Sequence, residues 1–358
     1  MIGQPLSDLK RDNALLWSVD IGRMHSRNNI VVRDNHAFVS SSGKRWNAKD
    51  EKDGVYCIDL NLGTIVWFTQ TNSDANEVTV LQDVVLVGTD EGRAFALDVK
   101  NGKLLRTFDA TAAIYTRAVE LERADHKTGV LVSYAGEIIE YDVDLNEFSL
   151  LATLPFPVRA NPVRIEKDTF IIGSETGSIT LVKFDGKNTN WKTVFQLTPY
   201  KSSGTLDHHL KIKGISSLVV RGDRVVVSYS RDTYDRRPPM VCFSLSTGRK
   251  VWDAGRIPAA SKTDISEFGN SRVTPVLYGD LVISTFAYND AVHAFSLSSG
   301  KWLWRQRLDA SYFQNWSSPV EHRGFLYVAR INGVLTVMNI STRKILSSYS
   351  VEHLRSVE

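Results

Sequence analysis

Residues 54–68 read GVYCIDLNLGTIVWF, and residues 291–304 read AVHAFSLSSGKWLW. In each stretch apolar and polar residues alternate, a tight turn containing glycine follows, and a second alternating run carries tryptophan. Alternation with a period of two is typical of a half-buried strand, and a glycine turn between two such runs predicts a β-hairpin. Weaker or equal copies occur at 92–108, 136–151, 177–195, 239–252 and 333–349.

A second hairpin precedes each of these copies. Examples are the apolar runs around polar turns at 216–230, 274–287 and 318–329. Two hairpins make a four-stranded unit, and we name its strands A to D in chain order. β-branched and aromatic residues are frequent throughout these units, whereas no helical stripe of apolar residues is present, which favours an all-β chain.

The repeat period identifies the architecture. The polar residue that ends strand C recurs after 39 residues between Asp59 and Asp98, and after 43 residues between Ser296 and Asn339. A period of about 40–45 residues is that of a propeller blade. The sequence therefore predicts a single β-propeller of about seven four-stranded blades.

Tryptophan recurs at one position of strand D. Trp67, Trp252 and Trp304 each lie eight residues after the residue that ends strand C. Because the same position follows the same turn, we expect these indoles to be buried at equivalent places between neighbouring blades.

The ends of the chain raise the question of ring closure. Residues 14–21, ALLWSVDI, resemble a strand D with its tryptophan, although no strands A to C precede them. We expect this segment to lie against blade 7 and close the ring. The predicted organisation is a polar segment at 1–13, a propeller at 14–351 and a tail at 352–358.

Composition excludes several classes of protein. With 43 basic and 40 acidic residues the net charge is only +3, which predicts no strong attraction to nucleic acid or anionic membrane. The first 13 residues contain no apolar stretch of a secretory signal, and no run of 18 apolar residues occurs. These features predict a cytoplasmic protein.

No catalytic or metal motif stands out. Cys57 and Cys242 occupy the position that alanine fills in other repeats, so we interpret them as small core residues. His208 and His209 lack further ligands at zinc-binding spacing. There is no nucleophile elbow, phosphate loop or dinucleotide fingerprint. We therefore expect no catalytic residue, no metal and no cofactor.

Four arginines precede an apolar residue of strand A by four positions. They are Arg27, Arg117, Arg159 and Arg272. Because strand A is innermost in a propeller, these side chains should gather at one mouth of the channel. A guanidinium with five donors could brace neighbouring blades, or the group could bind an anion. The brace is slightly favoured, and the two roles are compatible.

The long loops share one face of the predicted ring. In an up-and-down blade the D–A and B–C loops emerge on one face, and the A–B and C–D turns on the other. Most of the surplus length lies on the first face, at 42–54, 199–214, 230–239, 254–270 and 309–319. Such loops commonly bind partners, and Tyr, Trp and Arg are enriched in interface hot spots. The predicted partner-binding residues are Trp46, Tyr234, Arg236, Arg237, Phe268, Tyr312, Phe313 and Trp316.

The repeat resembles that of the quinoprotein-like (PQQ-like repeat) propeller family over nearly the whole chain. The resemblance implies tryptophans that dock between neighbouring blades. It does not imply the quinone cofactor, because quinoprotein dehydrogenases of this family typically carry eight blades and a neighbouring pair of cysteines, which this chain lacks. The chain is more similar to non-catalytic members, such as a propeller lipoprotein that assists outer-membrane protein assembly, although it shows no lipoprotein leader.

Taken together, these features favour a non-catalytic interaction module that holds another protein or peptide on its long-loop face. The alternative is a sensor that binds an anionic ligand, such as a nucleotide or a phosphorylated segment, at the arginine-lined channel mouth. An enzyme with its site in the channel is the least favoured, because no set of acid, base and nucleophile emerges. A nucleotide or phosphate that raises the thermal midpoint would favour the sensor.

Overall fold

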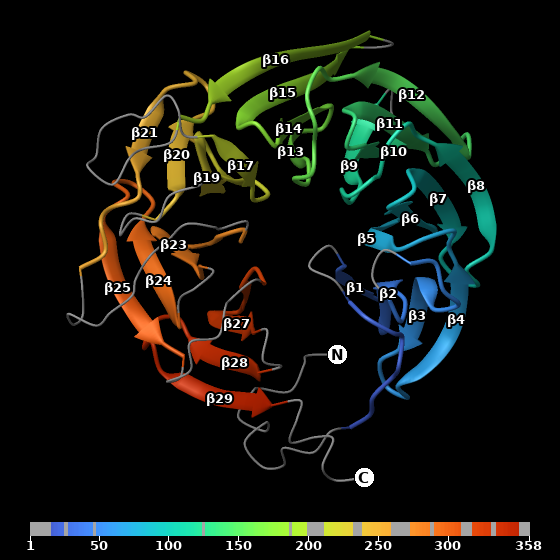
Figure 1. Cartoon of the computed structure of the whole chain (residues 1–358), viewed down its shortest axis with the longest axis horizontal. Coiled ribbons are helices and arrows are strands. Elements are labelled where there is room, and N and C mark those ends of the chain that lie inside the picture. The colour runs from blue at the N-terminus through green and yellow to red at the C-terminus, as the bar shows by residue number, and fades with distance from the viewer. Residues whose placement is uncertain are drawn as a thin grey trace.

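The computed structural model describes residues 16–24, 28–45, 48–123, 126–185, 188–198, 211–231, 238–258, 273–286, 290–308, 317–330 and 334–350. These residues form 29 β-strands and no helix. The strands build seven antiparallel sheets, which are arranged in a ring (Figure 1). The predicted seven-bladed β-propeller is therefore confirmed.

In every blade the first strand is innermost and the last lies at the rim (Figure 1). Blade 1 comprises β1 (Ile30–Arg33), β2 (His36–Ser42), β3 (Asp53–Asp59) and β4 (Thr64–Gln70). Blade 2 comprises β5 (Ala75–Leu81), β6 (Val84–Thr89), β7 (Arg93–Asp98) and β8 (Leu104–Asp109). Blade 3 comprises β9 (Val119–Arg123), β10 (His126–Val132), β11 (Glu137–Asp142) and β12 (Glu147–Thr153). Blade 4 comprises β13 (Val163–Glu166), β14 (Thr169–Gly173), β15 (Ser178–Asp185) and β16 (Asn188–Gln196).

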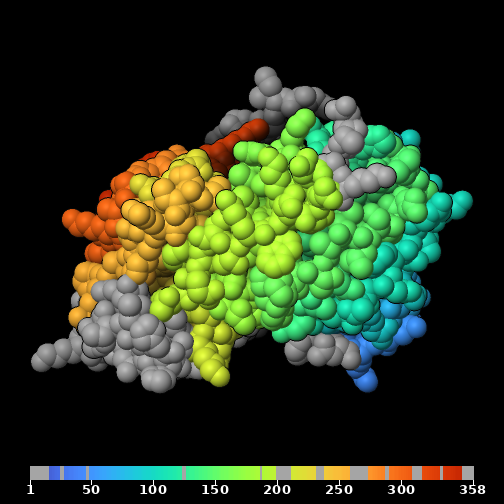
Figure 2. All heavy atoms as spheres, turned by 90° about the horizontal axis from the view of Figure 1, so that it is seen from above, coloured from blue at the N-terminus to red at the C-terminus, as the bar shows by residue number. Residues whose placement is uncertain are grey.

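Blade 5 differs in its inner strand, which is interrupted so that β17 and β18 both pair with β19. It comprises β17 (Ile212–Ile215), β18 (Val219–Arg221), β19 (Arg224–Arg231), β20 (Met240–Ser244) and β21 (Lys250–Asp253). Blade 6 comprises β22 (Val276–Tyr278), β23 (Leu281–Ser284), β24 (Ala291–Ser296) and β25 (Trp302–Arg307). Blade 7 comprises β26 (Val320–His322), β27 (Phe325–Ala329), β28 (Val334–Asn339) and β29 (Ile345–Ser350). Seen from the side, blades succeed one another around the rim in chain order (Figure 2).

The third strand of a blade ends in a turn that its last residue organises. The repeat position marked by Asp59 and Asp98 is the last residue of β3 and β7, as the sequence predicts. Asp98 Oδ1 accepts a hydrogen bond from the backbone N–H of Lys100 (2.8 Å). Four residues later Gly102 has a left-handed backbone (φ +70°), which glycine adopts at the lowest cost. A short polar side chain and a glycine therefore set the geometry of the outer hairpin.

Two of the repeat tryptophans are buried between blades, as predicted. Trp67 and Trp252 each lie opposite a cysteine of the neighbouring strand, next to a shift in register. Each indole Nε1–H donates to a backbone carbonyl of the following blade, that of Val99 (3.1 Å) or Leu297 (2.8 Å). These tryptophans join each outer strand to the outer turn of the next blade.

Trp304 occupies the equivalent place opposite Ala294 but is only half-buried. The turn that it faces has Arg343 (φ +60°), whereas the turns that Trp67 and Trp252 face have Gly102 and Gly300, and the Arg343 guanidinium carbon lies 6.0 Å from the indole centre. A side chain at this turn keeps the indole from docking as closely as it does on a glycine.

The apolar core lies between neighbouring blades. Clusters of buried described residues join blades at six junctions, from blades 1 and 2 around to blades 6 and 7. Cys57 and Cys242 belong to two of these clusters. Burial raises the pKa of both thiols to about 11. Both cysteines are therefore core residues, as predicted.

The N-terminal segment docks on blade 1 through side chains. Residues 16–24 form no strand among the described residues, and Figure 1 shows them beside blade 1, toward blade 7. Trp17 Nε1–H donates to the carbonyl of Leu60 (3.0 Å), and the indole packs on Gly63, where a Cβ atom would lie 2.2 Å away. The expected contact with blade 7 is thus replaced by docking on blade 1, because Trp17 binds its turn as Trp67 binds the turn of blade 2.

Candidate functional site

Most of the predicted site residues lie outside the described residues. These are the eight partner-binding candidates Trp46, Tyr234, Arg236, Arg237, Phe268, Tyr312, Phe313 and Trp316, and the two arginines Arg27 and Arg272. Their roles stay predictions. The structure does place Arg117 and Arg159, which precede the inner strands β9 and β13.

Arg159 lies over a pair of tyrosines. Its guanidinium carbon is 4.2 Å from the ring centre of Tyr115 and 5.6 Å from that of Tyr134. The two tyrosine rings meet edge to face with their centres 5.8 Å apart. A guanidinium over an aromatic face is attracted by the ring quadrupole, and the attraction is stronger when water is excluded. Stacking therefore orients this arginine.

The segments that carry this cluster share one face of the ring. Tyr115 and Arg159 lie in D–A connections, between β8 and β9 and between β12 and β13. Tyr134 and Glu175 lie in B–C connections, between β10 and β11 and between β14 and β15. This is the face that the sequence assigns to the long loops, since the order of strands in a blade decides which connections emerge together.

The charge of Arg159 is partly balanced within the cluster. Its Nε lies 3.9 Å from the carboxylate of Glu175, whose side chain is largely buried, whereas the Arg159 side chain is about one-third exposed. Among the described residues Arg159 Nε has no hydrogen-bond partner. A stacked guanidinium with an acid beside it fits the predicted brace better than an anion site.

Arg117 takes part in a bridge across three blades. Its backbone N–H donates to Oδ1 of Asn161 (2.9 Å), and Nδ2 of Asn161 donates to the carboxylate of Glu77 (2.7 Å). Burial raises the pKa of Glu77, although the Asn161 hydrogen bond and the Arg117 charge oppose this effect. The bridge joins blades 2, 3 and 4 at the approach to their inner strands.

Similar polar contacts join other inner strands. Asn29 donates to the carbonyl of Val78 (2.9 Å) and accepts from its N–H (2.7 Å). The N–H of Thr274 donates to the hydroxyl of Ser318 (2.9 Å). The sequence analysis missed these contacts, yet a signal was present. Asn29, Asn161 and Thr274 each lie two residues after one of the four arginines.

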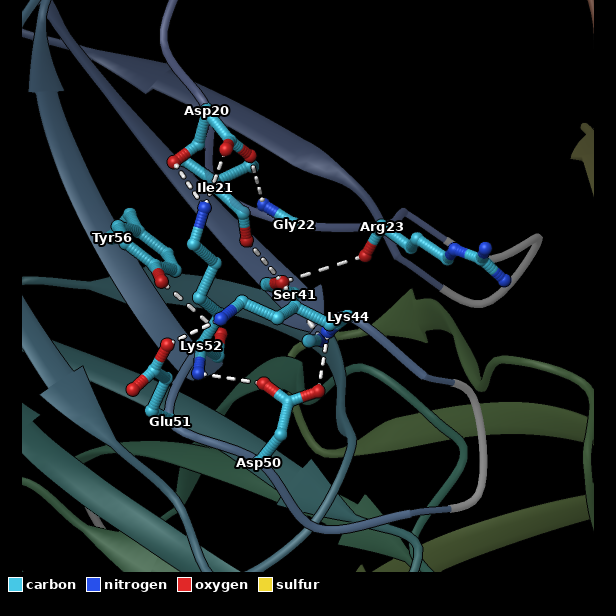
Figure 3. A network of polar contacts seen from close by, with 11 residues as sticks. Asp20, Ile21, Gly22, Arg23, Ser41, Lys44, Asp50, Glu51, Lys52 and Tyr56 are labelled. Atoms are coloured by element: carbon cyan, nitrogen blue, oxygen red, sulfur yellow. Dashed lines mark hydrogen bonds and ion pairs between the residues drawn. The ribbon is translucent and has the colours of Figure 1, made fainter.

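A charged network holds the N-terminal segment against the B–C loop of blade 1 (Figure 3). Lys52 Nζ lies 2.5 Å from the carboxylate of Asp20. The hydroxyl of Ser41 donates to the carbonyl of Ile21 (2.5 Å), and Asp50 accepts from the backbone N–H of Lys52 (2.7 Å). Exposed ion pairs contribute little singly, so the network mainly fixes the path of the segment.

One group of side chains within the described part of the chain has the composition of a metal site. His126 Nδ1 lies 3.3 Å from Asp142 and 3.6 Å from Asp144. The other oxygen of Asp142 accepts the backbone N–H groups of Asp144 (2.9 Å) and Leu145 (3.0 Å). This use in a turn accounts for Asp142 without a metal, and the group is otherwise an exposed histidine–carboxylate pair.

Comparison with known families settles the resemblance seen in the repeats. A family model described as outer membrane protein assembly factor BamB matches residues 5–254 and 239–352. The chain belongs to this family. The PQQ-like repeat inferred from the sequence is therefore confirmed.

A curated relative of the same name supports the assignment over a shorter stretch. The outer membrane protein assembly factor BamB of Legionella pneumophila (strain Paris) is 27% identical over 136 residues. These residues cover 38% of this chain and 32% of the relative. The match thus spans about a third of the relative's length.

Solved structures agree with the fold. BamB from Moraxella catarrhalis superposes with a TM-score of 0.65 at 18% identity, over 92% of this chain and 89% of that chain. The computationally designed Ika8 protein superposes with a TM-score of 0.62 at 13% identity, over 89% and 85% of the two chains. At these identities the likeness concerns the fold alone.

The predicted cytoplasmic location is contradicted by the family assignment. The BamB family takes its name from the assembly of outer membrane proteins. The prediction relied on the polar first 13 residues and on the absence of a long apolar run, but the location of a protein depends on targeting signals that a propeller does not need in order to fold. In the described residues, no helix has the length and apolar character needed to cross a membrane.

Proposed function

We propose that this chain is a non-catalytic scaffold in outer membrane protein assembly, and that it holds a partner protein on its D–A and B–C face. Membership of the BamB family supports the role in assembly. The observation that carries the choice of face is the stacked cluster of Arg159, Tyr115 and Tyr134. An anionic small ligand has no support from the family or from the described arginines.

The chemistry of the cluster suits protein binding. Arginine and tyrosine are enriched among interface hot spots, which lie in well-packed and desolvated places. Arg159 is held by aromatic stacking and its side chain is about one-third exposed, so a partner carbonyl or carboxylate can bind without reorganising the side chain. The predicted loop residues, such as Arg237 and Phe313, would extend the same face around the ring.

The proposal is tested by replacing Arg159 and a matched arginine of the same blade. Arg164 on β13 has a similar exposure and lies 3.5 Å from Glu122, away from the tyrosines. We expect Arg159→Ala to reduce capture of partner proteins from the outer membrane fraction of the native host at least about tenfold, because loss of a hot spot costs about 2 kcal/mol or more. Arg164→Ala should leave capture unchanged. Quantitative mass spectrometry of the captured proteins measures both.

Circular dichroism should show that both variants stay folded. Full capture by a folded Arg159→Ala variant would exclude the cluster from the binding face. The double variant Phe313→Ala with Arg237→Glu then tests the loop residues separately. Retention of wild-type affinity by that variant as well would contradict the choice of face.

A further inference from the structure

The junction between blades 7 and 1 differs from the other six. Leu335 lies four residues before the end of strand C and is 37% exposed. The equivalent residues of five other blades are at most 1% exposed and pack against the following blade: Val55, Ala94, Ile138, Met240 and Val292. Leu335 therefore points into a junction that is not filled as the others are.

The inner strands show the same difference. Val320 of β26 is 60% exposed, whereas its equivalent Leu121 of β9 is fully buried and its equivalents Val31, Val219 and Val276 are half-buried. On the opposite wall, Ile30 of β1 is 57% exposed, whereas its equivalents Val78 and Leu218 are at most 3% exposed. Val32, two residues along the same wall, is 62% exposed. Apolar side chains of the inner strands are thus left exposed on both walls of the junction between blades 7 and 1.

The N-terminal segment covers only part of this junction. Trp17, Val19 and Ile21 pack on the Ala37 and Tyr56 side of blade 1. The cluster that they form contains no residue of blade 7, and none of the described apolar clusters joins blades 7 and 1. The wall of blade 7 therefore lacks the apolar partner that each other blade provides for its neighbour.

The segment also offers backbone groups for pairing. Residues 16–19 make no backbone–backbone hydrogen bond to another described residue. Arg23, by contrast, is fixed to blade 1 by hydrogen bonds with Gly43 (2.7 Å) and Ser42 (3.0 Å). Unpaired N–H and C=O groups in an extended segment are a template for a further strand.

We propose that the junction between blades 7 and 1 binds an extended, uncharged β-strand of a client protein. The strand pairs with residues 16–19 and buries Ile30, Val32, Val320 and Leu335. This inference rests on the proposed role in outer membrane protein assembly, and it names the kind of client segment that the scaffold holds. The site is distinct from the Arg159 cluster, which lies between blades 3 and 4.

Three observations select this occupant. The four side chains that the strand would bury are aliphatic, so a charged segment would lose hydration against them. The junction already accommodates one extended segment, residues 16–24, which shows that extended backbone fits there. Transmembrane β-strands of outer membrane proteins have about ten residues with one apolar face, which matches an apolar wall beside a row of unpaired backbone groups.

The test uses the full chain and a fluorescent ten-residue peptide of alternating valine and threonine, with a glycol tail for solubility. We expect saturable binding by fluorescence anisotropy. Val320→Glu with Leu335→Glu should weaken binding at least tenfold. The control is Leu104→Glu with Leu145→Glu, which adds the same charges at exposed leucines of blades 2 and 3 and should bind like the wild type. A peptide of alternating lysine and glutamate should not bind.

A second measurement locates the peptide. A bromoacetyl group on the peptide should alkylate the variant Val320→Cys but not the variant Leu145→Cys. The two native thiols are buried, and their raised pKa keeps them unreactive. Alkylation at both positions to the same extent would show non-specific binding and overturn the proposal.

The outcomes separate this proposal from the proposed function. Absence of binding to the wild type, equal binding by both glutamate variants, or binding of the charged peptide would each overturn it. If the wild type forms dimers, and the Val320→Glu and Leu335→Glu changes dissociate them, the occupant is a second copy of the chain. That result would also overturn the proposal. Arg159→Ala should bind the peptide normally, and the variant with Val320→Glu and Leu335→Glu should still capture the partner protein. Peptide binding therefore tests only the junction, and partner capture tests only the proposed function.

Discussion

At the scale of single residues, Asp53 of blade 1 has a buried carboxylate with an incomplete set of hydrogen bonds. It is fully buried at the start of β3, and one carboxylate oxygen accepts the N–H of Asp50 (2.8 Å) while the other has no partner among the described residues. Burial raises the pKa of Asp53 to about 6, and the negative charges of Asp50, Asp74 and Asp90 add to this effect. The ionised form is therefore unfavourable in the native protein.

The raised pKa of Asp53 predicts how stability depends on pH. The folded value of about 6 lies above the ordinary value of 3.8, so the native state binds more protons than the unfolded state between these values. The destabilisation is complete above about pH 6 and disappears as the pH falls toward 4. Asp53→Asn should raise the free energy of unfolding at pH 7.5 by up to about 3 kcal/mol, with no gain near pH 4. Urea denaturation at both pH values measures this.

Asp50 provides a control of opposite sign. Partial burial opposes ionisation, but the backbone N–H groups of Lys52, Lys44 and Arg45 hold the pKa of Asp50 below its usual value. Asp50→Asn should therefore lower stability at pH 7.5. An Asp53→Asn variant that is less stable than the wild type at pH 7.5 would contradict the interpretation of Asp53.

At the scale of elements, the outer hairpins depend on the contact between a turn glycine and a tryptophan. Gly300 has a left-handed backbone (φ +69°), and a Cβ atom there would lie 2.6–2.8 Å from atoms of the Trp252 ring. Glycine is needed at this turn both for its conformation and for the approach of the indole. The same relation holds between Gly102 and Trp67, which explains why turn and tryptophan recur together.

A pair of glycines separates these two requirements. Gly279 also has a left-handed backbone (φ +54°), but a Cβ atom there would meet nothing within 4 Å. Gly279→Ala should cost about 1 kcal/mol, because only the backbone is strained. Gly300→Ala should cost about 1–3 kcal/mol more, because the indole must also move. Chemical denaturation of both variants measures the difference, and equal costs would show that docking on Gly300 adds nothing.

At the scale of the whole molecule, the ring depends on the N-terminal segment where blades 7 and 1 meet. Trp17 docks on Leu60 and Gly63 of blade 1, and the ion pair between Lys52 and Asp20 holds the next turn of the chain. Among the described residues no apolar cluster joins blades 7 and 1, so this junction is stabilised by fewer apolar contacts of the described residues than the other junctions are. We expect blade 1 to open locally before the other blades do.

Removal of the Trp17 indole tests this expectation. Trp17→Ala should lower the unfolding midpoint and speed hydrogen exchange in β3 and β4 while β20 and β21 stay protected. Trp191→Ala is the control, because Trp191 on β16 is an exposed indole within blade 4, and it should change neither quantity. Uniform acceleration of exchange in all blades would instead mean that the ring opens as one unit.

Local chemistry was sufficient to predict the blades. The signals that predict a blade are local or recur at a constant spacing. They are the alternation of apolar and polar residues, the polar residue that ends each third strand, the glycine turn, and the tryptophan position of Trp67 and Trp252. They determine the pairing inside a sheet, and the period of about 40 residues determines the number of sheets. The burial of Cys57 and Cys242 follows from the same register, because the equivalent alanines are also buried.

Contacts between distant parts of the chain were decided only by the tertiary structure. Asn161 bonds to Glu77 across 84 residues, and Arg159 stacks on Tyr115, although the sequence could show only that arginines recur at the inner strands. The docking of Trp17 on blade 1 and the exposed walls at Leu335 and Val320 depend on how seven blades divide one turn of a ring. Ring closure depends on all seven blades together, because each blade follows the same local pattern. The incompletely filled junction therefore occurs only where the first and last blades meet.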